Sequence, residues 1–397
     1  RPIFMGNTMK VFIIAGEPSG DKLGAALMKG LEAQVLDIEF EGIGGPLMEE
    51  LNLESLFSIN ELSLMGLAEI LPKYLHLKSR IRQTAAAIIA AKPNVLITID
   101  SPDFCLRVAQ LVKAGSNIRT VHYVAPTVWA WRPKRAAKMA RYIDHVLALF
   151  PFEPPYMDEA GMSCDFVGHP VAAEPSVTRA ELDDFKTRHG IIHHPVLAIL
   201  PGSRQSEIAR LGATFNSSYV QVAATFQTVL VPTLPYLAQA VSDALPLRSA
   251  TLRCIVSGSN MSPQDAARER YIAMAFADVA LAASGTVSLE LAAVRTPMVI
   301  AYDMHWISRQ IISRMLLTDT VTLVNLVSET RTIPEFIGSG CQPAPIAEAL
   351  MSTLADPTAQ FDALDLTMDR LGRGGEALGL RAARAVLAHL TTKNNSF

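Results

Sequence analysis

The sequence predicts an α/β protein with two Rossmann-like, doubly wound domains. Short runs of β-branched and aliphatic residues alternate with longer helical patterns, which is typical of βαβ units on a parallel sheet. A polar stretch, residues 187–195, interrupts this alternation near the middle of the chain. The chain has 397 residues, of which 50% are hydrophobic, so it is long enough for two or three domains. We therefore expect one parallel sheet on each side of the interruption.

The expected elements follow in order along the chain. The first strand, KVFIIAG, leads into a helix that runs through Met28. The first half continues with three strand-like runs, NVLITID, TVHYVAP and HVLALF. The second half contains VLAIL, RCIVSG, DVALAAS and PMVIAY, with helical segments between them. We assign residues 1–190 to an N-terminal domain, 191–370 to a C-terminal domain and 371–397 to a last helix that packs back across both.

Composition narrows the class of protein and its compartment. A net charge of −3 and an isoelectric point near 6.3 disfavour a protein that wraps nucleic acid. The four cysteines lie far apart without a C-x-x-C pair, which predicts a reducing, cytoplasmic compartment and no thiolate metal site. No run approaches the roughly 18 consecutive apolar residues of a membrane span, so we expect any membrane contact to be peripheral.

One strand of the second half ends in a turn suited to an anion. After VLAIL, the turn residue Gly202 and the helix-capping residue Ser203 precede Arg204. The guanidinium of Arg204 carries a permanent charge and a planar fork of donors that matches phosphate. A tight strand-to-helix turn with an N-cap explains the same residues without any ligand.

A second turn of this kind follows DVALAAS. Ser284, Gly285 and Thr286 open it, and the helix that follows offers free N–H groups to a phosphate. Glu290, further along that helix, could reach the hydroxyls of a ribose. Each turn alone is a weak signal, but two in one domain favour a site for a nucleotide diphosphate.

The first strand of the N-terminal half ends in GEPSGDKLG. Its glycines, Gly16, Gly20 and Gly24, are spaced four apart, which is neither the dinucleotide fingerprint G-x-G-x-x-G nor a P-loop. The motif therefore indicates neither NAD nor ATP. Its plain interpretation is a glycine-rich turn in which Ser19 or Asp21 starts a helix.

A carboxylate follows the strand NVLITI. Asp100 stands at the predicted carboxyl end of that strand, where it can act as a general base towards a substrate hydroxyl. Asp103 is the rival base, and either residue could instead cap the following helix. A base in one domain and a diphosphate site in the other suggest transfer of a group from a nucleotide donor to an alcohol. Two doubly wound domains normally bind such ligands in the cleft between them.

The third cluster, VHYVAPTVWAWRPKR, places aromatic residues beside cations. Trp129 and Trp131 precede a basic series that starts at Arg132. Such a cluster can stack sugars or bases and hold phosphates. A helix with solvated charges and packed tryptophans is the commoner explanation, and the acidic chain as a whole disfavours nucleic acid.

Together these motifs resemble one family, the lipid-A-disaccharide synthases, which are glycosyltransferases of the two-domain GT-B type. The matching stretches run from Gly16 to about Asn325. They are GEPSGDKLGA, GIGGPLME, LSLMGLAEILP, IDSPDF, HYVAPTVWAWRPKR, LFPFEPPY, VGHPV, LPGSRQSEI and ASGTVSLELA. The resemblance implies an inverting transfer of diacylglucosamine from UDP-2,3-diacylglucosamine to 2,3-diacylglucosamine 1-phosphate (lipid X), which gives the lipid A disaccharide 1-phosphate and UDP.

The resemblance also implies roles for three residues, Asp100, Arg204 and Asn325. Asp100 would take the proton from the 6-hydroxyl of the acceptor, while Arg204 stabilises the charge on the departing UDP. The role of Asn325 stays open. We expect no cofactor and no metal, because no strand-end turn carries a D-x-D pair that could hold Mg²⁺. Two positions depart from the family pattern: Asp303, where a basic residue is expected, and Val324, where proline is more usual.

Residues 65–77, MGLAEILPKYLHL, admit two interpretations. An apolar stripe at helical spacing is typical of a core-facing helix. It consists of Leu67, Ile70, Leu71, Tyr74, Leu77, Ile81, Ala85 and Ile88, with Leu75 at its margin. However, Pro72 predicts that the regular helix begins near it, and no acidic residue lies between Glu69 and Asp100. With the resemblance added, we expect the start of this segment, called the lip, to dock on the membrane and admit acyl chains, while residues from Ile81 onward serve the core. The lip residues are Met65, Leu67, Ile70 and Leu71.

The expected partners follow from the resemblance. They are UDP-diacylglucosamine, lipid X, the inner face of the inner membrane and a second copy of the chain, without nucleic acid. Besides the lip, the acceptor side is expected to hold Gly16, Glu17, Ser19, Trp129 and Arg132. Two alternatives remain: a UDP-sugar epimerase of the same architecture, which would need no lipid, and a noncatalytic membrane- or phosphate-binding protein.

Overall fold

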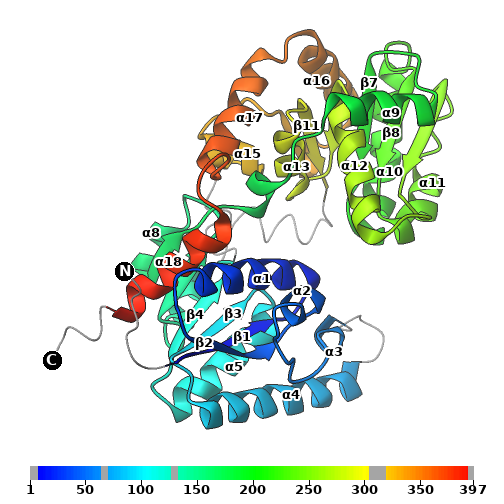
Figure 1. Cartoon of the computed structure of the whole chain (residues 1–397). Helices are drawn as coiled ribbons and strands as arrows, with labels where there is room; N and C mark the ends of the chain where they lie inside the picture. The colour runs from blue at the N-terminus through cyan, green and yellow to red at the C-terminus, as the bar shows by residue number, and fades with distance from the viewer. Residues whose placement is uncertain (1–7, 64–69, 127–132, 304–318, 392–397) are drawn as a thin grey trace. The chain divides into compact units, whose positions relative to one another are not determined.

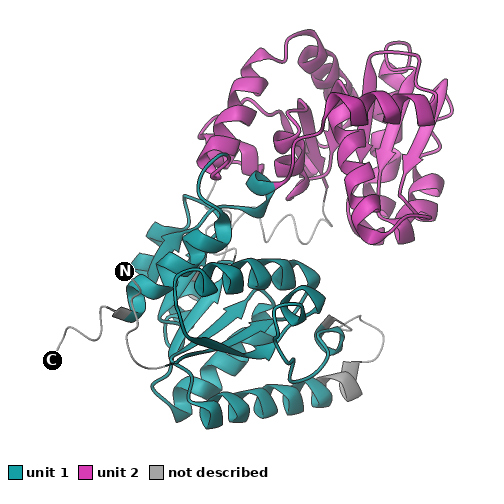
Figure 2. Ribbon diagram, in the orientation of Figure 1, with its two compact units in different colours: residues 1–173, 374–397 teal, residues 174–373 magenta. Residues whose placement is uncertain are grey.

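The computed structural model describes residues 8–63, 70–126, 133–303 and 319–391 (Figure 1). The chain forms two compact units, residues 1–173 with 374–397 and residues 174–373 (Figure 2). Each unit contains one six-stranded sheet in which all paired strands are parallel. The predicted fold class, two doubly wound α/β domains, is therefore confirmed.

The sheet of unit 1 has the strand order β2-β1-β3-β4-β5-β6. Its strands are β1 (Met9–Ala15), β2 (Ile38–Ile43), β3 (Val95–Ile99), β4 (Arg119–Tyr123), β5 (His145–Ala148) and β6 (Ser163–Phe166). Its described helices are α1 (Pro18–Glu32), α2 (Pro46–Glu49), α3 (Asn60–Ser63), α4 (Ile70–Ala91), α5 (Pro102–Gly115), α7 (Pro133–Met139), α8 (Pro154–Glu159) and α18 (Leu378–Thr391).

Helices cover both faces of this sheet (Figure 1). On β1, Val11 and Ile13 belong to a buried cluster with α1 and α18, whereas Phe12 and Ile14 belong to a cluster with α4 and α5. Because successive side chains of a strand point to opposite faces, both faces of β1 must be apolar. This explains why the strand has the continuous apolar run VFIIA rather than an alternating pattern.

The C-terminal helix α18 returns to unit 1 and packs on α1 (Figure 1). The two helices approach so closely that a Cβ at Gly379 would lie 2.0 Å from the Ala26 carbonyl oxygen. Likewise, a Cβ at Gly30 would lie 2.1 Å from the Gly379 carbonyl oxygen. Glycine is therefore required on both sides of the crossing. Within the predicted last segment, 371–397, helix α18 is built into the core of unit 1 through Ala382, Ala383, Val386 and Leu387.

The sheet of unit 2 has the strand order β12-β11-β10-β7-β8-β9. Its strands are β7 (Val196–Leu200), β8 (Thr228–Pro232), β9 (Leu252–Val256), β10 (Val279–Ala282), β11 (Met298–Tyr302) and β12 (Glu335–Ile337). Its described helices are α9 (Arg179–His189), α10 (Gln205–Val222), α11 (Ala238–Ala244), α12 (Pro263–Phe276), α13 (Val287–Ala293), α15 (Leu323–Ser328), α16 (Pro343–Ala355) and α17 (Thr358–Arg370).

Unit 2 begins at Glu174, earlier than the boundary after residue 190 that the sequence predicted. Helix α9 belongs to this unit because it packs against α12. Arg188 donates two hydrogen bonds to the Glu269 carboxylate, at 2.7 and 3.0 Å, and His189 contacts the same carboxylate at 2.8 Å. The polar stretch 187–195 marks the end of α9 and the approach to β7, not the border between the units.

Helix α4 is described from Ile70 to Ala91, and residues 64–69 before it lie outside the described part of the chain. Leu77, Ile81 and Ile88 are buried in the core of unit 1, which confirms the core-facing part of the predicted stripe. The Leu75 side chain, at the margin of the stripe, is 63% exposed. Outside the described residues lie the lip positions Met65 and Leu67 and the side chains of Ile70 and Leu71.

None of the helices within the described ranges is both long and apolar enough to cross a membrane.

We predict that Gly379→Ala loosens α18 from α1. Alanine is about 1 kcal/mol more favourable than glycine inside a helix, so propensity alone would stabilise this variant. Overpacking against a backbone carbonyl works in the opposite direction and typically costs about 1–3 kcal/mol. We expect the overpacking cost to exceed the gain in helix propensity. The variant should therefore have a lower midpoint of thermal unfolding and faster proteolysis near the C-terminus. The control is Gly340→Ala, because a Cβ at Gly340 meets nothing within 4 Å; an equal change in both variants would contradict the prediction.

Candidate functional site

Unit 1 presents two carboxylates where neighbouring strands end. Asp100 follows β3 directly, and Glu17 comes shortly after β1, which pairs with β3. The Asp100 N–H donates to the Tyr123 carbonyl at 2.9 Å, so the pairing of β3 with β4 extends to this residue. Asp100 has a φ of 52°, in the left-handed region that Asp and Asn tolerate better than most residues. The backbone thus fixes Asp100, half-buried, at the carboxyl edge of the sheet.

The surroundings of Asp100 favour the proton-accepting role predicted for it. Burial raises the pKa of Asp100, against a smaller opposing effect of the Ser101 backbone N–H. Partial removal of its carboxyl from water and the negative charge of Asp100 also raise the pKa of Glu17. A carboxylate with a raised pKa is a stronger base and is matched better to proton transfer near neutral pH. The rival Asp103 is exposed in the first turn of α5.

Gly16, one of the predicted acceptor residues, lies in tight contact with Ser101, next to Asp100. A Cβ at Gly16 would lie 2.3 Å from the Ser101 Oγ, so only glycine fits between the ends of β1 and β3. Glu17 and Ser19 follow and are exposed at the start of α1. The other predicted acceptor residues outside the lip, Trp129 and Arg132, lie outside the described residues.

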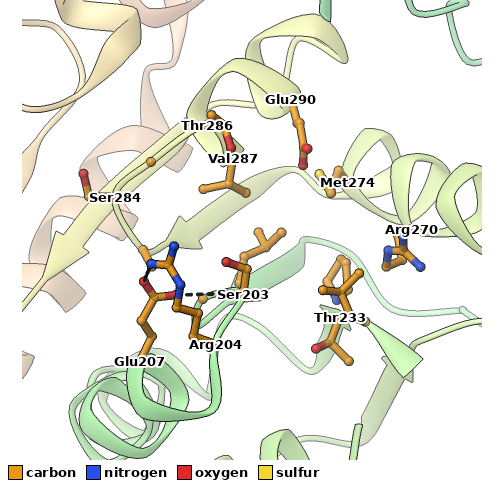
Figure 3. Close-up of a pocket in the computed structure, with 16 residues that line it drawn as sticks. Ser203, Arg204, Glu207, Thr233, Arg270, Met274, Ser284, Thr286, Val287 and Glu290 are labelled. Carbon is orange, nitrogen blue, oxygen red and sulfur yellow. Dashed lines mark hydrogen bonds and ion pairs between the residues drawn. The ribbon is translucent and has the colours of Figure 1, made fainter. Parts of the chain in front are cut away.

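Unit 2 contains a pocket of about 450 Å³ at the carboxyl ends of β7, β8 and β10 (Figure 3). Two turns that are far apart in the sequence, β7–α10 and β10–α13, form much of its wall. All residues predicted to bind the nucleotide line it: Gly202, Ser203, Arg204, Ser284, Gly285, Thr286 and Glu290. Parallel strands bring their carboxyl ends to one edge of the sheet, which is why these residues meet.

Glu207, which the sequence analysis did not single out, organises the β7–α10 turn. Its carboxylate accepts the Ser203 N–H at 2.9 Å and an N–H of the Arg204 guanidinium at 3.4 Å (Figure 3). Gly202 has a φ of 126°, and a Cβ there would lie 2.6 Å from a Glu207 carboxylate oxygen. The Arg204 side chain is 76% exposed, so it is available to a ligand in the pocket. No sequence motif indicates this role, because Ser203 and Glu207 are four residues apart and the N-cap of α10 is Arg204, whereas a capping box needs Ser or Thr three residues before the Glu.

The β10–α13 turn leaves room for a ligand beside its backbone. Gly285 has a φ of 136°, which favours glycine, and a Cβ there would meet nothing within 4 Å. The glycine therefore serves the backbone conformation and open space rather than packing. The Ser288 hydroxyl donates to the Gly285 carbonyl at 3.0 Å and so stabilises the turn.

A second missed residue, Arg270 of α12, lines the pocket with Glu290 (Figure 3). Burial raises the pKa of Glu290, while the positive charge of Arg270 works against this shift. Burial lowers the pKa of Arg270, and the charge of Glu290 opposes that change. Thr233 and Met274 complete this side of the pocket. No motif marks Arg270, Thr233 or Met274, because Thr233 follows a strand end without glycine and the other two lie within helix α12.

Asn325 does not line the pocket. It is buried in α15, where its side-chain amide donates to the Ile333 carbonyl at 3.0 Å and its oxygen accepts the Ile333 N–H at 3.1 Å. A further contact, at 3.4 Å, joins the amide to the Thr320 hydroxyl. The Asn325 side chain therefore ties together the chain on both sides of α15. Of the two departures from the family pattern, Val324 is buried, and the Asp303 carbonyl accepts a hydrogen bond from Arg210 at 3.3 Å.

Comparisons with known proteins agree with this architecture. The family model for lipid-A-disaccharide synthetase matches residues 11–377. A lipid-A-disaccharide synthase of Ruegeria pomeroyi is 56% identical over 97% of this chain and 96% of its own length. One from Rhodospirillum centenum is 43% identical over 96% and 95%.

Solved structures share the fold at low sequence identity. UDP-GlcNAc 2-epimerase from Neisseria meningitidis, bound to UDP-GlcNAc, has a TM-score of 0.62 at 13% identity and covers 97% of this chain and 100% of its own. MurG of Acinetobacter baumannii has a TM-score of 0.50 at 11% identity, with the same coverage. These structures support the GT-B fold and nothing finer. The matches along nearly the whole sequence show that the chain belongs to the lipid-A-disaccharide synthase family, glycosyltransferases that act in lipid A biosynthesis.

Proposed function

We propose that the chain transfers diacylglucosamine from UDP-2,3-diacylglucosamine to the 6-hydroxyl of lipid X, with inversion at the anomeric carbon. The observation that carries this proposal is the unit 2 pocket, where both predicted diphosphate-binding turns meet. The leaving group of this glycosyl donor is UDP, whose diphosphate gains negative charge as the bond to the sugar breaks. Stabilising that charge requires cations and N–H donors near the leaving oxygen. Arg204 and the two glycine turns supply such groups at one place.

Asp100 is the proposed general base. As the acceptor oxygen forms its bond to the anomeric carbon, the hydroxyl proton passes to the Asp100 carboxylate and the bond to the diphosphate breaks. Burial raises the pKa of the Asp100 carboxyl and so favours proton uptake. The residues proposed here need no metal, because Arg204 carries the positive charge that the leaving group requires.

Asn325 acts indirectly in this proposal. Its side-chain amide already holds the backbone of Ile333, which suggests that it shapes the chain around α15 rather than touching a substrate. Loss of a buried side-chain amide that makes two hydrogen bonds to the backbone leaves backbone groups unpaired and disturbs the local fold. The family's expected dependence on this position is compatible with such a positioning role.

We also propose that the enzyme works at the inner face of the inner membrane. Both substrates carry acyl chains, so at least part of each must be drawn from a bilayer. The exposed Leu75 continues the predicted lip, and the exposed Lys78 and Arg82 lie beside it on α4. An apolar edge beside basic residues is suited to anionic lipid. The homodimer implied by the resemblance also remains a proposal, and sedimentation equilibrium tests it.

An epimerase with the same architecture is the alternative. The likeness to UDP-GlcNAc 2-epimerases rests on 13% identity and concerns the fold alone. An epimerase would act on a UDP-sugar without any lipid acceptor. Product analysis therefore separates the two functions.

The first prediction about function concerns Asp100→Asn. Purified protein with UDP-2,3-diacylglucosamine and lipid X should release UDP and form the disaccharide. Loss of a general base typically lowers the rate about 10²- to 10⁴-fold, and we expect a loss of this size. Asp103→Asn is the matched control and should keep its activity. Product mass analysis checks the result; equal losses in both variants, or no disaccharide from folded parent protein that binds UDP, would count against the proposal.

The same variant should not lose stability. The pKa of Asp100 is raised in the folded protein, so ionisation of this group opposes folding. This cost is absent below the unfolded pKa of about 3.9 and develops as pH rises towards the folded value. Asn removes it, so Asp100→Asn should unfold at the same or a higher temperature than the parent at pH 7, with no gain near pH 3. A clear fall in the midpoint at pH 7 would mean that lost activity reflects damage to the fold.

The second prediction separates the two contacts of Glu207. A hydrogen bond to a charged group contributes about 1.5–3 kcal/mol, whereas an exposed ion pair contributes about 0–1 kcal/mol. The bond to the Ser203 N–H should therefore matter more than the pair with Arg204. We expect Glu207→Ala to lower kcat/KM for the UDP-sugar about tenfold or more, while Glu207→Gln, which keeps an acceptor, loses only a few-fold. Similar losses for Gln and Ala would instead assign the main effect to the charge.

The third prediction concerns membrane binding. Leu75→Glu should weaken binding to vesicles that contain anionic phospholipid about tenfold, because burial of one leucine side chain contributes about 1.5–3 kcal/mol. Leu36, which is 85% exposed and lies between α1 and β2, supplies the control variant Leu36→Glu. Vesicle flotation measures both. Equal binding by the two variants would show that the Leu75 region does not dock on lipid.

A further inference from the structure

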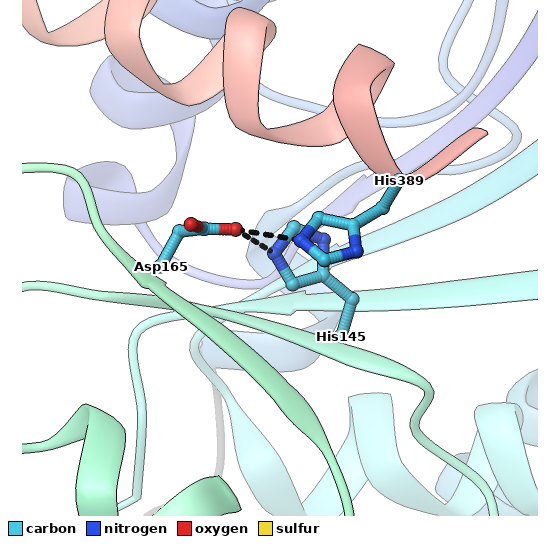
Figure 4. Close-up of side chains that lie close together, drawn as sticks. All are labelled: His145, Asp165 and His389. Carbon is cyan, nitrogen blue, oxygen red and sulfur yellow. Dashed lines mark hydrogen bonds and ion pairs between the residues drawn. The ribbon is translucent and has the colours of Figure 1, made fainter. Parts of the chain in front are cut away.

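Unit 1 holds a cluster of two histidines and an aspartate that the proposed reaction does not use. The Asp165 Oδ2 lies 2.8 Å from the His145 Nε2 and 2.9 Å from the His389 Nε2 (Figure 4). All three atoms lie within 4.8 Å of one another. The two imidazole rings have centroids 4.1 Å apart and are tilted by 41°. The Nε2 atoms of the two histidines thus converge on one carboxylate oxygen.

Three elements that are far apart in the sequence build this cluster. His145 opens β5, Asp165 lies in the neighbouring strand β6, and His389 comes from the C-terminal helix α18. His145 is fully buried. The close crossing of α1 and α18 at Gly30 and Gly379 fixes the helix that carries His389. The three side chains are therefore held in place by the fold before any ligand arrives.

We propose that His145, Asp165 and His389 bind one divalent transition-metal ion, with Zn²⁺ as the best match, and that this ion fastens α18 to the sheet. Two imidazole nitrogens and a carboxylate oxygen suit Zn²⁺, and the same donor set also occurs in Fe²⁺ sites. Bonds of about 2.0–2.2 Å in tetrahedral geometry separate ligand atoms by about 3.3 Å, so a shift of about half an ångström from the observed hydrogen-bond distances is enough.

Binding replaces two hydrogen bonds by coordinate bonds. Each neutral imidazole then carries its proton on Nδ1 and turns the Nε2 lone pair towards the ion. The side chains of Asp165 and His389 are 42% and 30% exposed, so water can reach the ion and complete its coordination. The exposed pair can also make the small movement that the longer ligand spacing requires.

Two features limit the affinity. The His145 Nδ1 is buried and has no hydrogen-bond partner within the described part of the chain, so its proton in the bound state has no acceptor. The guanidinium of Arg119 is close enough to help lower the pKa of His145, and its charge opposes a second cation. Absence of an outer partner typically weakens a metal site about 10- to 100-fold. We therefore expect a micromolar rather than a nanomolar dissociation constant.

The site is separate from the proposed reaction. His145 stands at the amino end of β5, whereas Asp100 follows the carboxyl end of β3 in the same parallel sheet. The two groups therefore belong to opposite edges of the sheet. An ion held by β5, β6 and α18 would act on the attachment of the C-terminal helix, not on the transfer.

The test is a Zn²⁺ titration of the tag-free, chelator-treated full chain by calorimetry. We expect one ion per chain at micromolar concentration and a rise in the midpoint of thermal unfolding with Zn²⁺. His389→Gln and Asp165→Asn should weaken binding at least about tenfold. His194→Gln is the matched control, because His194 contacts Asp278 at 3.3 Å without a third ligand in the described chain, and it should bind like the parent.

If the parent protein binds Zn²⁺ no more tightly than His389→Gln does, the proposal is overturned. The cluster is then only a hydrogen-bonded bridge. A second measurement does not depend on the folding of any variant. Co²⁺ added to the parent should produce visible d–d absorption, and Zn²⁺ should shift the side-chain ¹⁵N resonances of two histidines. Unchanged histidine resonances at saturating Zn²⁺ would equally exclude the site.

Discussion

Parallel pairing of every strand is the constraint on which the chemistry of this enzyme depends. A parallel sheet covered on both faces leaves little room for polar side chains along its strands, and every residue of β3 and β7 is buried. The groups proposed to act on substrate therefore stand where strands end. Because the strands run in one direction, their carboxyl ends share an edge, and short turns from different parts of the chain meet there. Asp100 in unit 1 and the pocket in unit 2 both follow from this arrangement.

The turns at these edges use backbone conformations that most residues avoid. Asp100, Ser101, Gly202 and Gly285 all have positive φ, and each directly follows a strand or comes shortly after it. Such conformations are costly for residues with a side chain and persist where the surroundings determine them. At Asp100 the extended pairing with β4 supplies that support, and in the β7–α10 turn the Glu207 carboxylate does. The sheets and the turns at their edges thus hold the positive-φ residues of the proposed sites in place.

Much of this fold could be predicted from sequence, because buried strands have continuous apolar runs and the diphosphate turns have glycines. Three of the four edge strands escaped prediction: β2, β6 and β12 are only partly buried and lack such runs. The interior strand β8, with TVLVP, could have been found. Glu207 and Arg270 were missed because their roles depend on which turn or strand end each helix faces. The unit boundary was misplaced because the contacts of α9 with Glu269 leave no local pattern.

The return of α18 to unit 1 has a consequence for biosynthesis. Unit 2 is one continuous segment, residues 174–373, and a ribosome can release all of it before α18 emerges. The core of unit 1, by contrast, includes Ala382, Val386 and Leu387 of α18. One apolar face of its sheet therefore stays uncovered until α18 has been synthesised. Domains generally fold as units during synthesis, in the order in which they are completed. The first half of this polypeptide is therefore the last part to finish folding.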